Sequence, residues 1–412
     1  LSKKELQKIV LRQPAIIGYS FDDNIKPTLA AVRKELNLSD SELRKIVVLL
    51  PSFIGCSFDG NIKPTLNTVR DYLNLSNKEL RKIVVQLPSF LTYNFNDNIK
   101  PSLDALQNHL NLSNDELRKI VVLQPSIISY SFDDNIKLTL EAIQNYLELS
   151  NKELRKIVLS QPAIIGYNFD DNIKPTLDAV RNELILSNDD LRKIVVRLPS
   201  IIGYNFDDNI KPSLNAVRDY LNLSNDELRK VVLSKPSIIG YSFDGNIKPM
   251  LDALQGRLGI SNAEMKKMVV ALPSIIGYSN VIPKLDWLQT TFDLTQLQLL
   301  IVVNKNKMLM GVSLEGTLVP GVLFWRECFK DRTDMEAMAE IISKPRELAQ
   351  SNRRLQKRSA LFREWHIPQK LLWGKAAYTD DNLDIWMQRK CYEYHISTAS
   401  MPTTRSRSDQ ID

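Results

Sequence analysis

The sequence contains few of the residues on which catalysis and metal binding usually depend. Its 412 residues include only three cysteines and three histidines. The cysteines Cys56, Cys328 and Cys391 form no CxxC pair, which argues against a disulfide framework and a zinc ribbon and fits a reducing compartment. The phosphate-binding, dinucleotide-binding and zinc-protease motifs GxxxxGKS/T, GxGxxG and HExxH are all missing. We therefore expect no enzymatic activity, no metal, no cofactor and no small-molecule substrate.

Long apolar runs are missing as well, and neither sign of charge strongly dominates. No run reaches the roughly 18 apolar residues that a bilayer span requires, so we expect no membrane partner. The 54 Lys and Arg residues exceed the 48 Asp and Glu residues by a net charge of +6, which permits a polyanionic partner without establishing one. Because the chain begins at Leu1, already inside a repeat, we expect it to be processed or truncated, with any targeting segment outside it.

What the chain does contain is one unit of 37 residues that occurs eight times in succession. A leucine or isoleucine opens each unit, at Leu1, Leu38, Leu75, Leu112, Leu149, Leu186, Leu223 and Ile260. A fixed period of about 20–50 residues is typical of a solenoid, in which neighbouring repeats supply each other's core. Solenoids present long surfaces that suit extended partners.

Each unit predicts two helices joined by a short apolar segment. In the second unit, Ser39 and Glu42 form a capping box, which indicates a first helix that ends before Pro51. The apolar residues that follow Pro51 predict a turn of 3-10 or short helix. A second helix is indicated by a buried stripe at helical spacing, Ile62, Leu66, Val69 and Leu73. No stretch alternates at period two as a sheet would, so we predict an all-α fold.

Three recurring motifs connect these units with a known family. Leu-Ser-x-x-Glu-Leu-Arg-Lys-Ile-Val, Pro-Ser-x-Ile-Gly-Tyr-Ser and Asn-Ile-Lys-Pro-x-Leu resemble the motifs of the mitochondrial transcription termination factor (mTERF) family. The resemblance covers residues 1 to about 290. It implies a right- or left-handed helical-repeat solenoid (superhelix) of about ten mTERF-like units that binds nucleic acid in a mitochondrion or plastid.

The resemblance weakens towards the C-terminal end of the chain. Thr295-Gln-Leu-Gln298 and Thr333-Asp-Met-Glu336 resemble the starts of a ninth and a tenth unit. We therefore expect eight regular repeats over residues 1–290 and two degenerate repeats that cap the solenoid over residues 291–370. A C-terminal segment over residues 371–412 would follow, with a disordered tail from Thr403 to Asp412.

Basic residues seven positions apart on the second helix are the candidate phosphate contacts. This spacing places both residues on one helix face, about 10 Å apart. The stripe is locally positive in the first, second and sixth units, mixed in the fifth, where Asp178 stands beside Arg181, and not positive in the third, fourth and seventh. The predicted nucleic-acid-binding residues of the positive and mixed units are Lys26, Arg33, Lys63, Arg70, Lys174, Arg181, Lys211 and Arg218. The alternative is a solvated helix flank whose charges serve solubility.

Three further positions recur in the repeats but contribute less to the predicted binding surface. The Arg-Lys pair on the first helix has acidic residues one turn earlier, as Arg44 follows Asp40 by four residues and Lys45 follows Glu42 by three. We interpret it as a solvated face with pairs of about 0.2–0.5 kcal/mol. The residue at the end of the first helix varies from unit to unit, as it would in a protein that reads its partner one repeat at a time, although a loosely constrained surface would vary in the same way. The arginines at this position, Arg12 and Arg197, are added to the predicted nucleic-acid contacts. The recurring tyrosines are expected to pack between units rather than to stack on bases.

Two functions of different class remain open at this point. The family resemblance implies an organelle gene-expression factor that acts in transcription termination or regulation, or in transcript processing, through duplex DNA or RNA. The alternative is a protein-binding helical scaffold, which the near-neutral third, fourth and seventh units keep open. The salt dependence of binding distinguishes the two functions. Affinity for phosphates falls steeply as the salt concentration rises, whereas affinity for a protein in an apolar groove does not.

Overall fold

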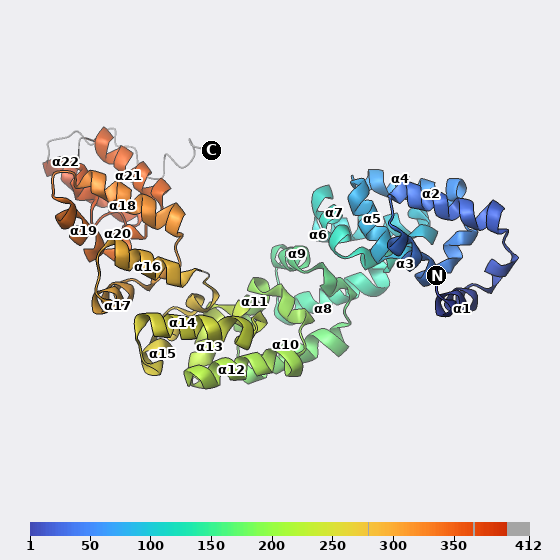
Figure 1. The fold of residues 1–412 in the computed structure, drawn as a ribbon, viewed down its shortest axis with the longest axis horizontal. Coiled ribbons are helices and arrows are strands. Elements are labelled where there is room, and N and C mark those ends of the chain that lie inside the picture. The colour runs from blue at the N-terminus through green and yellow to red at the C-terminus, as the bar shows by residue number, and fades with distance from the viewer. Residues whose placement is uncertain (279, 366, 394–412) are drawn as a thin grey trace. The chain divides into compact units, whose positions relative to one another are not determined.

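The protein is helical throughout the part that the structure describes. The computed structural model describes residues 1–278, 280–365 and 367–393, and no strand occurs in these ranges. The predicted all-α helical-repeat solenoid is therefore confirmed, and Figure 1 shows its helices in chain order. The predicted disordered tail from Thr403 to Asp412 lies outside the described residues.

A capped helix opens each regular unit. In the second unit, Ser39 Oγ accepts a hydrogen bond from the Glu42 N–H, and the Glu42 carboxylate accepts one from the Ser39 N–H. Seven of these helices begin with the same reciprocal box, and in the sixth unit Ser187 accepts from the N–H of Asp190. The first helices are α1 (Lys3–Arg12), α3 (Asp40–Leu49), α5 (Asn77–Gln86), α7 (Asn114–Leu123), α9 (Asn151–Ser160), α11 (Asn188–Arg197), α13 (Asn225–Ser234) and α15 (Asn262–Ala271).

The predicted 3-10 turn follows each first helix. Pro51 occupies the first position of such a turn, where its missing N–H leaves no backbone bond unmade. The buried side chains of Phe53 and Ile54 then fill the space behind it. These turns are η1 (Pro14–Gly18), η3 (Pro51–Gly55), η5 (Pro88–Thr92), η7 (Pro125–Ser129), η9 (Pro162–Gly166), η11 (Pro199–Gly203), η13 (Pro236–Gly240) and η15 (Pro273–Gly277).

A π-helical turn, which the sequence pattern did not indicate, leads into the second helix. In the second unit the Ile62 N–H donates to the Ser57 carbonyl five residues back, and Ser57 Oγ accepts from the Gly60 N–H. The turn therefore begins on its own serine cap. The π turns are η2 (Phe21–Ile25), η4 (Phe58–Ile62), η6 (Phe95–Ile99), η8 (Phe132–Ile136), η10 (Phe169–Ile173), η12 (Phe206–Ile210) and η14 (Phe243–Ile247).

The second helices carry the predicted buried stripe. Ile62, Leu66, Val69 and Leu73 are at most 2% exposed, which confirms that stripe. Several of these helices end in a left-handed residue, most often asparagine, which tolerates positive φ. The second helices are α2 (Lys26–Leu36), α4 (Lys63–Tyr72), α6 (Lys100–Leu110), α8 (Lys137–Leu147), α10 (Lys174–Leu184), α12 (Lys211–Leu221), α14 (Lys248–Leu258) and α16 (Val281–Thr291).

The C-terminal part contains shorter and less regular elements. Capping boxes at Thr295 and Thr333 start α17 and α19. The elements are α17 (Gln296–Lys305), η16 (Lys307–Met310), η17 (Leu314–Leu318), α18 (Val319–Cys328), α19 (Asp334–Ser343), α20 (Pro345–Leu348), α21 (Asn352–Glu364), η18 (Gln369–Leu372) and α22 (Asp380–Glu393). The expected division of the chain at residues 290 and 370 stays a prediction.

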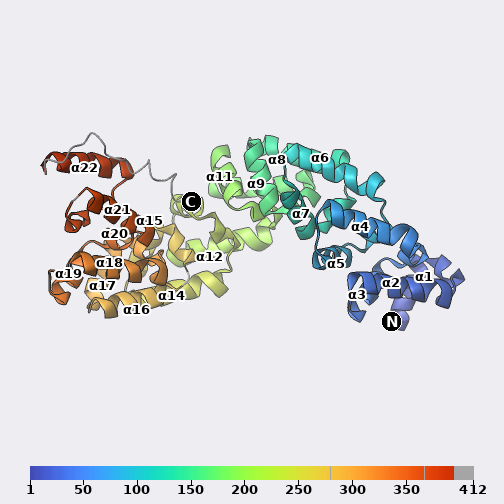
Figure 2. The ribbon, with the colours of Figure 1, turned by 90° about the horizontal axis from the view of Figure 1, so that it is seen from above.

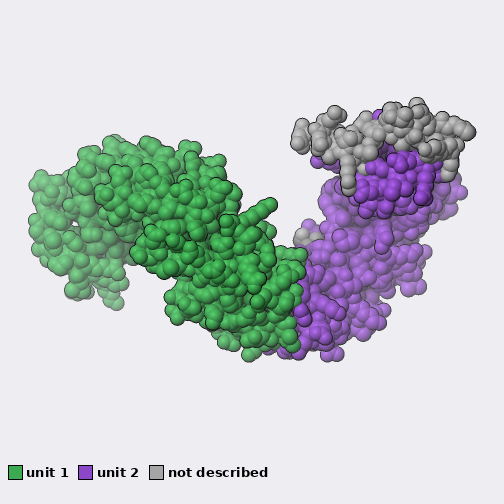
Figure 3. All heavy atoms as spheres, turned by 180° about the vertical axis from the view of Figure 1, so that it is seen from behind, with its two compact units in different colours: residues 1–212 green, residues 213–412 purple. Residues whose placement is uncertain are grey.

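The chain forms two compact units, residues 1–212 and residues 213–412, which Figure 3 colours separately. Within the first unit, each of the helices α1, α3, α5, α7 and α9 contacts the next one, so the first helices form one row. Figure 2 shows α4, α6 and α8 following one another in a second row. The first-helix row and the second-helix row share the apolar core between them.

Candidate functional site

An arginine and a glutamate join most of the first helices to the first helix of the preceding repeat. The Arg44 guanidinium donates to both carboxylate oxygens of Glu5, at 2.9 and 2.7 Å. The predicted pairing of Arg44 with Asp40 is wrong, because the planar guanidinium fits the Glu5 carboxylate with two parallel bonds and Asp40 pairs with Arg33. We term these inter-repeat pairs clamps: Arg44–Glu5, Arg81–Glu42, Arg118–Glu79, Arg155–Glu116, Arg192–Glu153 and, with lysine, Lys266–Glu227.

The clamp glutamates also belong to the capping boxes, and both roles favour the ionised carboxylate. Hydrogen bonds from Arg81, and then from Ser39, lower the pKa of Glu42 from 4.5 to about 2. Those from Arg192 act in the same way on Glu153 and lower its pKa to about 2. These glutamates are therefore charged at neutral pH, and each is neutralised by its clamp arginine.

The arginines of the predicted stripe on the second helices are engaged by neighbouring protein groups. Arg70 is 30% exposed, donates to Asn67 at 2.7 Å and lies 3.9 Å from Glu35 of the preceding repeat. Arg218 has the same exposure and donates to Asn215 at 2.6 Å. These guanidinium groups would have to exchange protein partners for a phosphate.

Arg33 and Arg181 are engaged in the same way. Arg33 forms an ion pair with Asp40 of the next repeat at 2.8 Å. Arg181 pairs with Asp178 and donates to Asn188 at 3.0 Å. The absence of an acidic residue one helical turn away therefore did not leave Arg33 without a partner, because the partner comes from the following repeat.

The lysines of the same stripe are more available. Lys26 lies 3.9 Å from Asp22, and Lys174 lies 3.8 Å from Asp178. Lys63 and Lys211 are exposed and form no ion pair with any residue that the structure describes. The stripe as a phosphate-binding surface stays a prediction, supported by these lysines more than by its arginines.

Packing between repeats explains why the stripe varies from unit to unit. The Tyr146 hydroxyl donates to Asp178 of the next repeat at 2.5 Å, and its ring packs edge-on against Phe169 with centroids 5.6 Å apart. Burial, and then the contact with Asp178, raise the pKa of Tyr146 to about 12. The same hydroxyl–carboxylate contact joins Tyr72 to Asp104 and Tyr220 to Asp252. Acidic residues in the third, fifth and seventh units therefore serve the repeat interface.

The predicted arginines at the ends of first helices also have protein partners. Arg12 donates to the carbonyl oxygens of Val48 and Leu49, at 2.9 and 3.1 Å, and so caps the last turn of α3. Arg197 lies exposed at the corresponding position of α11 and is likewise engaged. As predicted contacts these two residues remain untested, although Arg12 has a structural role.

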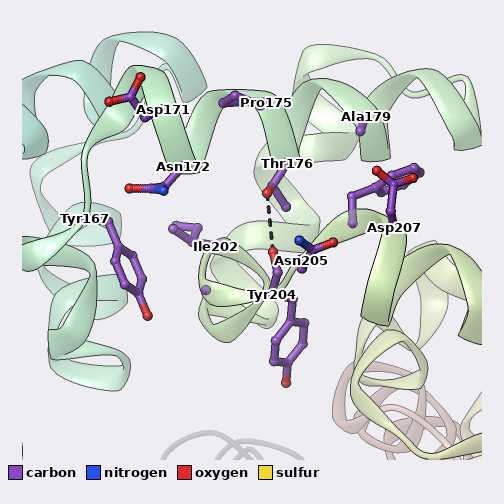
Figure 4. Close-up of a pocket in the computed structure, with 12 residues that line it drawn as sticks. Tyr167, Asp171, Asn172, Pro175, Thr176, Ala179, Ile202, Tyr204, Asn205 and Asp207 are labelled. Carbon is purple, nitrogen blue, oxygen red and sulfur yellow. Dashed lines mark hydrogen bonds between the residues drawn. The ribbon is translucent and has the colours of Figure 1, made fainter.

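A pocket of about 450 Å³ between the fifth and sixth repeats shows how the recurring tyrosines are used (Figure 4). Thr176 Oγ1 donates to the carbonyl oxygen of Tyr204 at 3.3 Å. The half-buried Tyr167 ring reaches the next repeat, where its hydroxyl would lie 3.0 Å from a Cβ atom placed on Gly203. Packing of the tyrosines between repeats is confirmed. Aspartates such as Asp171 line the pocket and disfavour a phosphate there.

The lysine that follows each clamp position is exposed, as the interpretation of this face as solvated predicted, but most of these lysines lack the predicted pairing with the glutamate three residues earlier. One exposed lysine occupies this position in all eight regular repeats. Lys193 pairs with Asp189 at 2.5 Å, and the other seven form no hydrogen bond or ion pair with a described residue. We term this set the lysine ladder: Lys8, Lys45, Lys82, Lys119, Lys156, Lys193, Lys230 and Lys267. The glutamate three residues earlier is unavailable to most of these lysines because a clamp holds it.

A groove of about 910 Å³ lies beside the ladder, within the compact unit of residues 1–212. Its walls include Gln86 and three exposed lysines that form no ion pair with a described residue, Lys45, Lys78 and Lys82. The two glutamates in the groove are both held by clamp arginines. The three lysines are thus the uncompensated charges of the groove, which makes it suited to an anion.

Other kinds of site receive no support from the described residues. Among them, no group of three or more His, Cys, Asp or Glu side chains could hold a metal ion. None of the helices described is both long and apolar enough to cross a membrane.

Comparison with known proteins gives the family. A search of curated proteins found no match to the chain. A family model described as mTERF matches two overlapping regions, residues 1–183 and 145–326, which together cover most of the sequence. These regions contain all eight regular repeats with their capping boxes, clamps and ladder lysines. The chain therefore belongs to the mTERF family.

Proposed function

We propose that this protein is a nucleic-acid-binding gene-expression factor of mitochondria or plastids, acting in transcription termination or regulation or in transcript processing. Family membership supports the general role, and the lysine ladder is the observation that carries the binding surface. Within the compact unit of residues 1–212, six exposed ammonium groups recur at one position of consecutive repeats, and five of them form no hydrogen bond or ion pair with a described residue. A regular row of cations suits the regular row of phosphates in a nucleic-acid backbone, whose binding releases condensed counterions.

The ladder is a stronger candidate than the stripe on the second helices. A ladder lysine such as Lys82 has no described ion pair to break when it meets a phosphate, whereas Arg70 must leave Asn67 and Arg181 must leave Asp178. The two surfaces lie on different helix rows. The stripe therefore remains a second candidate surface, which its exposed lysines Lys26, Lys63 and Lys211 can represent in an experiment.

The test is a titration of the protein with duplex DNA, single-stranded DNA and single-stranded RNA of matched length, at about 50 and 200 mM salt. The ladder variant carries three substitutions, Lys45→Ala, Lys82→Ala and Lys119→Ala. Each lost phosphate contact lowers the slope of log affinity against log salt by about 0.7 on a single strand and 0.9 on a duplex. The triple variant should therefore lose about 2 to 3 units of slope.

The matched control carries Lys26→Ala, Lys63→Ala and Lys211→Ala, which remove the same charge from exposed lysines of the other row. Its slope should change by less than about one unit. A loss confined to this control would reject the ladder and favour the stripe. If the unsubstituted protein binds none of the three nucleic acids at the lower salt, the proposed function is wrong and a protein partner becomes the better explanation.

A further inference from the structure

A second exposed position accompanies every lysine of the ladder. It lies four residues after the lysine, one helical turn further along the same face and at the end of the first helix. All eight residues at this position are exposed, and they differ in chemistry: Arg12, Leu49, Gln86, Leu123, Ser160, Arg197, Ser234 and Ala271. Each regular repeat thus presents a constant cation beside a variable side chain.

The groove beside α3 and α5 brings the two positions together. Lys45 and Lys82 line it with Gln86, whose side chain forms no hydrogen bond to a described residue. A glutamine side chain offers two donors and one acceptor and can pair with the edge of a base. The groove therefore has cations suited to phosphates and an uncommitted amide suited to a base.

We propose that the first-helix row of residues 1–212 reads single-stranded nucleic acid at one nucleotide per repeat, with the ladder lysine on the phosphate and the variable residue on the base. This inference rests on the proposed function and specifies its substrate. Position-by-position reading requires that each repeat contributes independently, and a solenoid whose repeats contact mainly their neighbours meets that requirement. The exposed leucines Leu49 and Leu123 would cover the apolar face of a base, whereas Gln86 would bind a base edge.

The spacing of the ladder favours a single strand over a duplex. Adjacent packed helices lie about 8–10 Å apart, so the first-helix row offers one lysine at each such interval. A strand of duplex DNA returns to the same side only once per helical turn, about 34 Å, and its base edges are paired. A duplex lying along the row would leave most ladder lysines without a phosphate. A single strand can place a phosphate at each lysine and turn its unpaired bases towards the variable residues.

The experiment selects binding sequences from randomised pools of single-stranded RNA and single-stranded DNA, using the full chain and two variants. Gln86→Leu and Leu123→Gln each install a residue that another regular repeat already carries at this position, so the fold should be retained. Each variant should change the base preference at one nucleotide position on the order of tenfold. The two affected positions should be adjacent, because residues 86 and 123 occupy equivalent places in consecutive repeats.

The control is Leu138→Gln. It changes an exposed leucine on the second-helix row, in the repeat that also contains Leu123, and it should leave base preference unchanged. The proposed one-nucleotide-per-repeat recognition would be overturned if both test variants kept the base preference of the wild-type protein. The proposed function would still stand if, in the same experiment, the wild-type protein bound and the ladder variant lost salt dependence. Tighter binding of a matched duplex than of either single strand would also overturn it. Failure of the wild-type protein to bind any of these nucleic acids would overturn both proposals.

Discussion

The clamps between first helices predict that neighbouring residues of one helix differ sharply in their contribution to stability. Arg118 donates to both carboxylate oxygens of Glu79 at about 3 Å, and these side chains are 31% and 25% exposed. Exposed ion pairs contribute about 0.2–1 kcal/mol, and a two-bond pair that is largely shielded should lie near the upper end. Arg118→Ala should therefore lower the free energy of unfolding by about 1 kcal/mol. Lys119→Ala removes an exposed charge that has no ion pair among the described residues, and it should change the free energy of unfolding by less than about 0.5 kcal/mol.

Urea unfolding followed by circular dichroism measures both variants, and a double-mutant cycle with Glu79→Ala isolates the pair. Glu79 also caps α5, so its single substitution should cost more, about 1–2 kcal/mol. Hydrogen exchange should show weaker protection in α5 and α7 than in more distant repeats, because stability in a repeat array is coupled between neighbours. Equal effects of Arg118→Ala and Lys119→Ala, or a coupling energy of zero in the cycle, would refute the clamp.

Three further predictions concern stability. Hydrogen bonds lower the pKa of Glu42 to about 2 in the folded protein. The stabilising contribution of the Glu42 carboxylate is therefore complete above pH 4.5 and disappears as the pH falls towards 2. An acid titration followed by circular dichroism should show loss of helix in this window. Gly166→Ala places a Cβ atom 2.9 Å from the Tyr130 hydroxyl and should lower stability by about 1 kcal/mol, whereas Gly18→Ala meets nothing within 4 Å and should not lower it. A thermal melt that ranks these two variants the other way contradicts the packing. Ile185→Asn relieves a β-branched residue at φ 51° and should raise the urea midpoint by an amount equivalent to about 1 kcal/mol.

Local sequence signals predicted the elements of the repeat well. The Ser39–Glu42 box marked the start of α3, Pro51 marked its end, and the spacing of Ile62 and Leu66 gave the buried face of the second helix. Each of these signals acts within about one or two helical turns of the chain, so a single repeat contains all the information it needs.

These local signals could not predict the contacts between repeats. Arg44 and Glu5 are 39 residues apart, so a comparison with residues one turn away assigned Arg44 to the wrong partner. The same comparison treated Lys45 as paired with Glu42, although a clamp holds Glu42 and Lys45 forms no ion pair within the described part of the chain. The π turn was missed because its five residues resemble the start of an ordinary helix. A useful signal was nevertheless present, since every Arg-Lys pair follows an acidic residue of the preceding repeat, a glutamate in all pairs but one, at a constant distance.

The hydroxyl–carboxylate contacts between second helices limit how this array can change in length. Tyr72, Tyr146 and Tyr220 stand in alternate repeats, and the aspartate that each one binds stands in the following repeat. Loss of a repeat that contributes one partner alone, such as the fourth with Tyr146 or the fifth with Asp178, would leave a donor or an acceptor without its counterpart. Gene duplication that copies a pair of repeats preserves both halves, so related arrays are expected to gain and lose repeats two at a time.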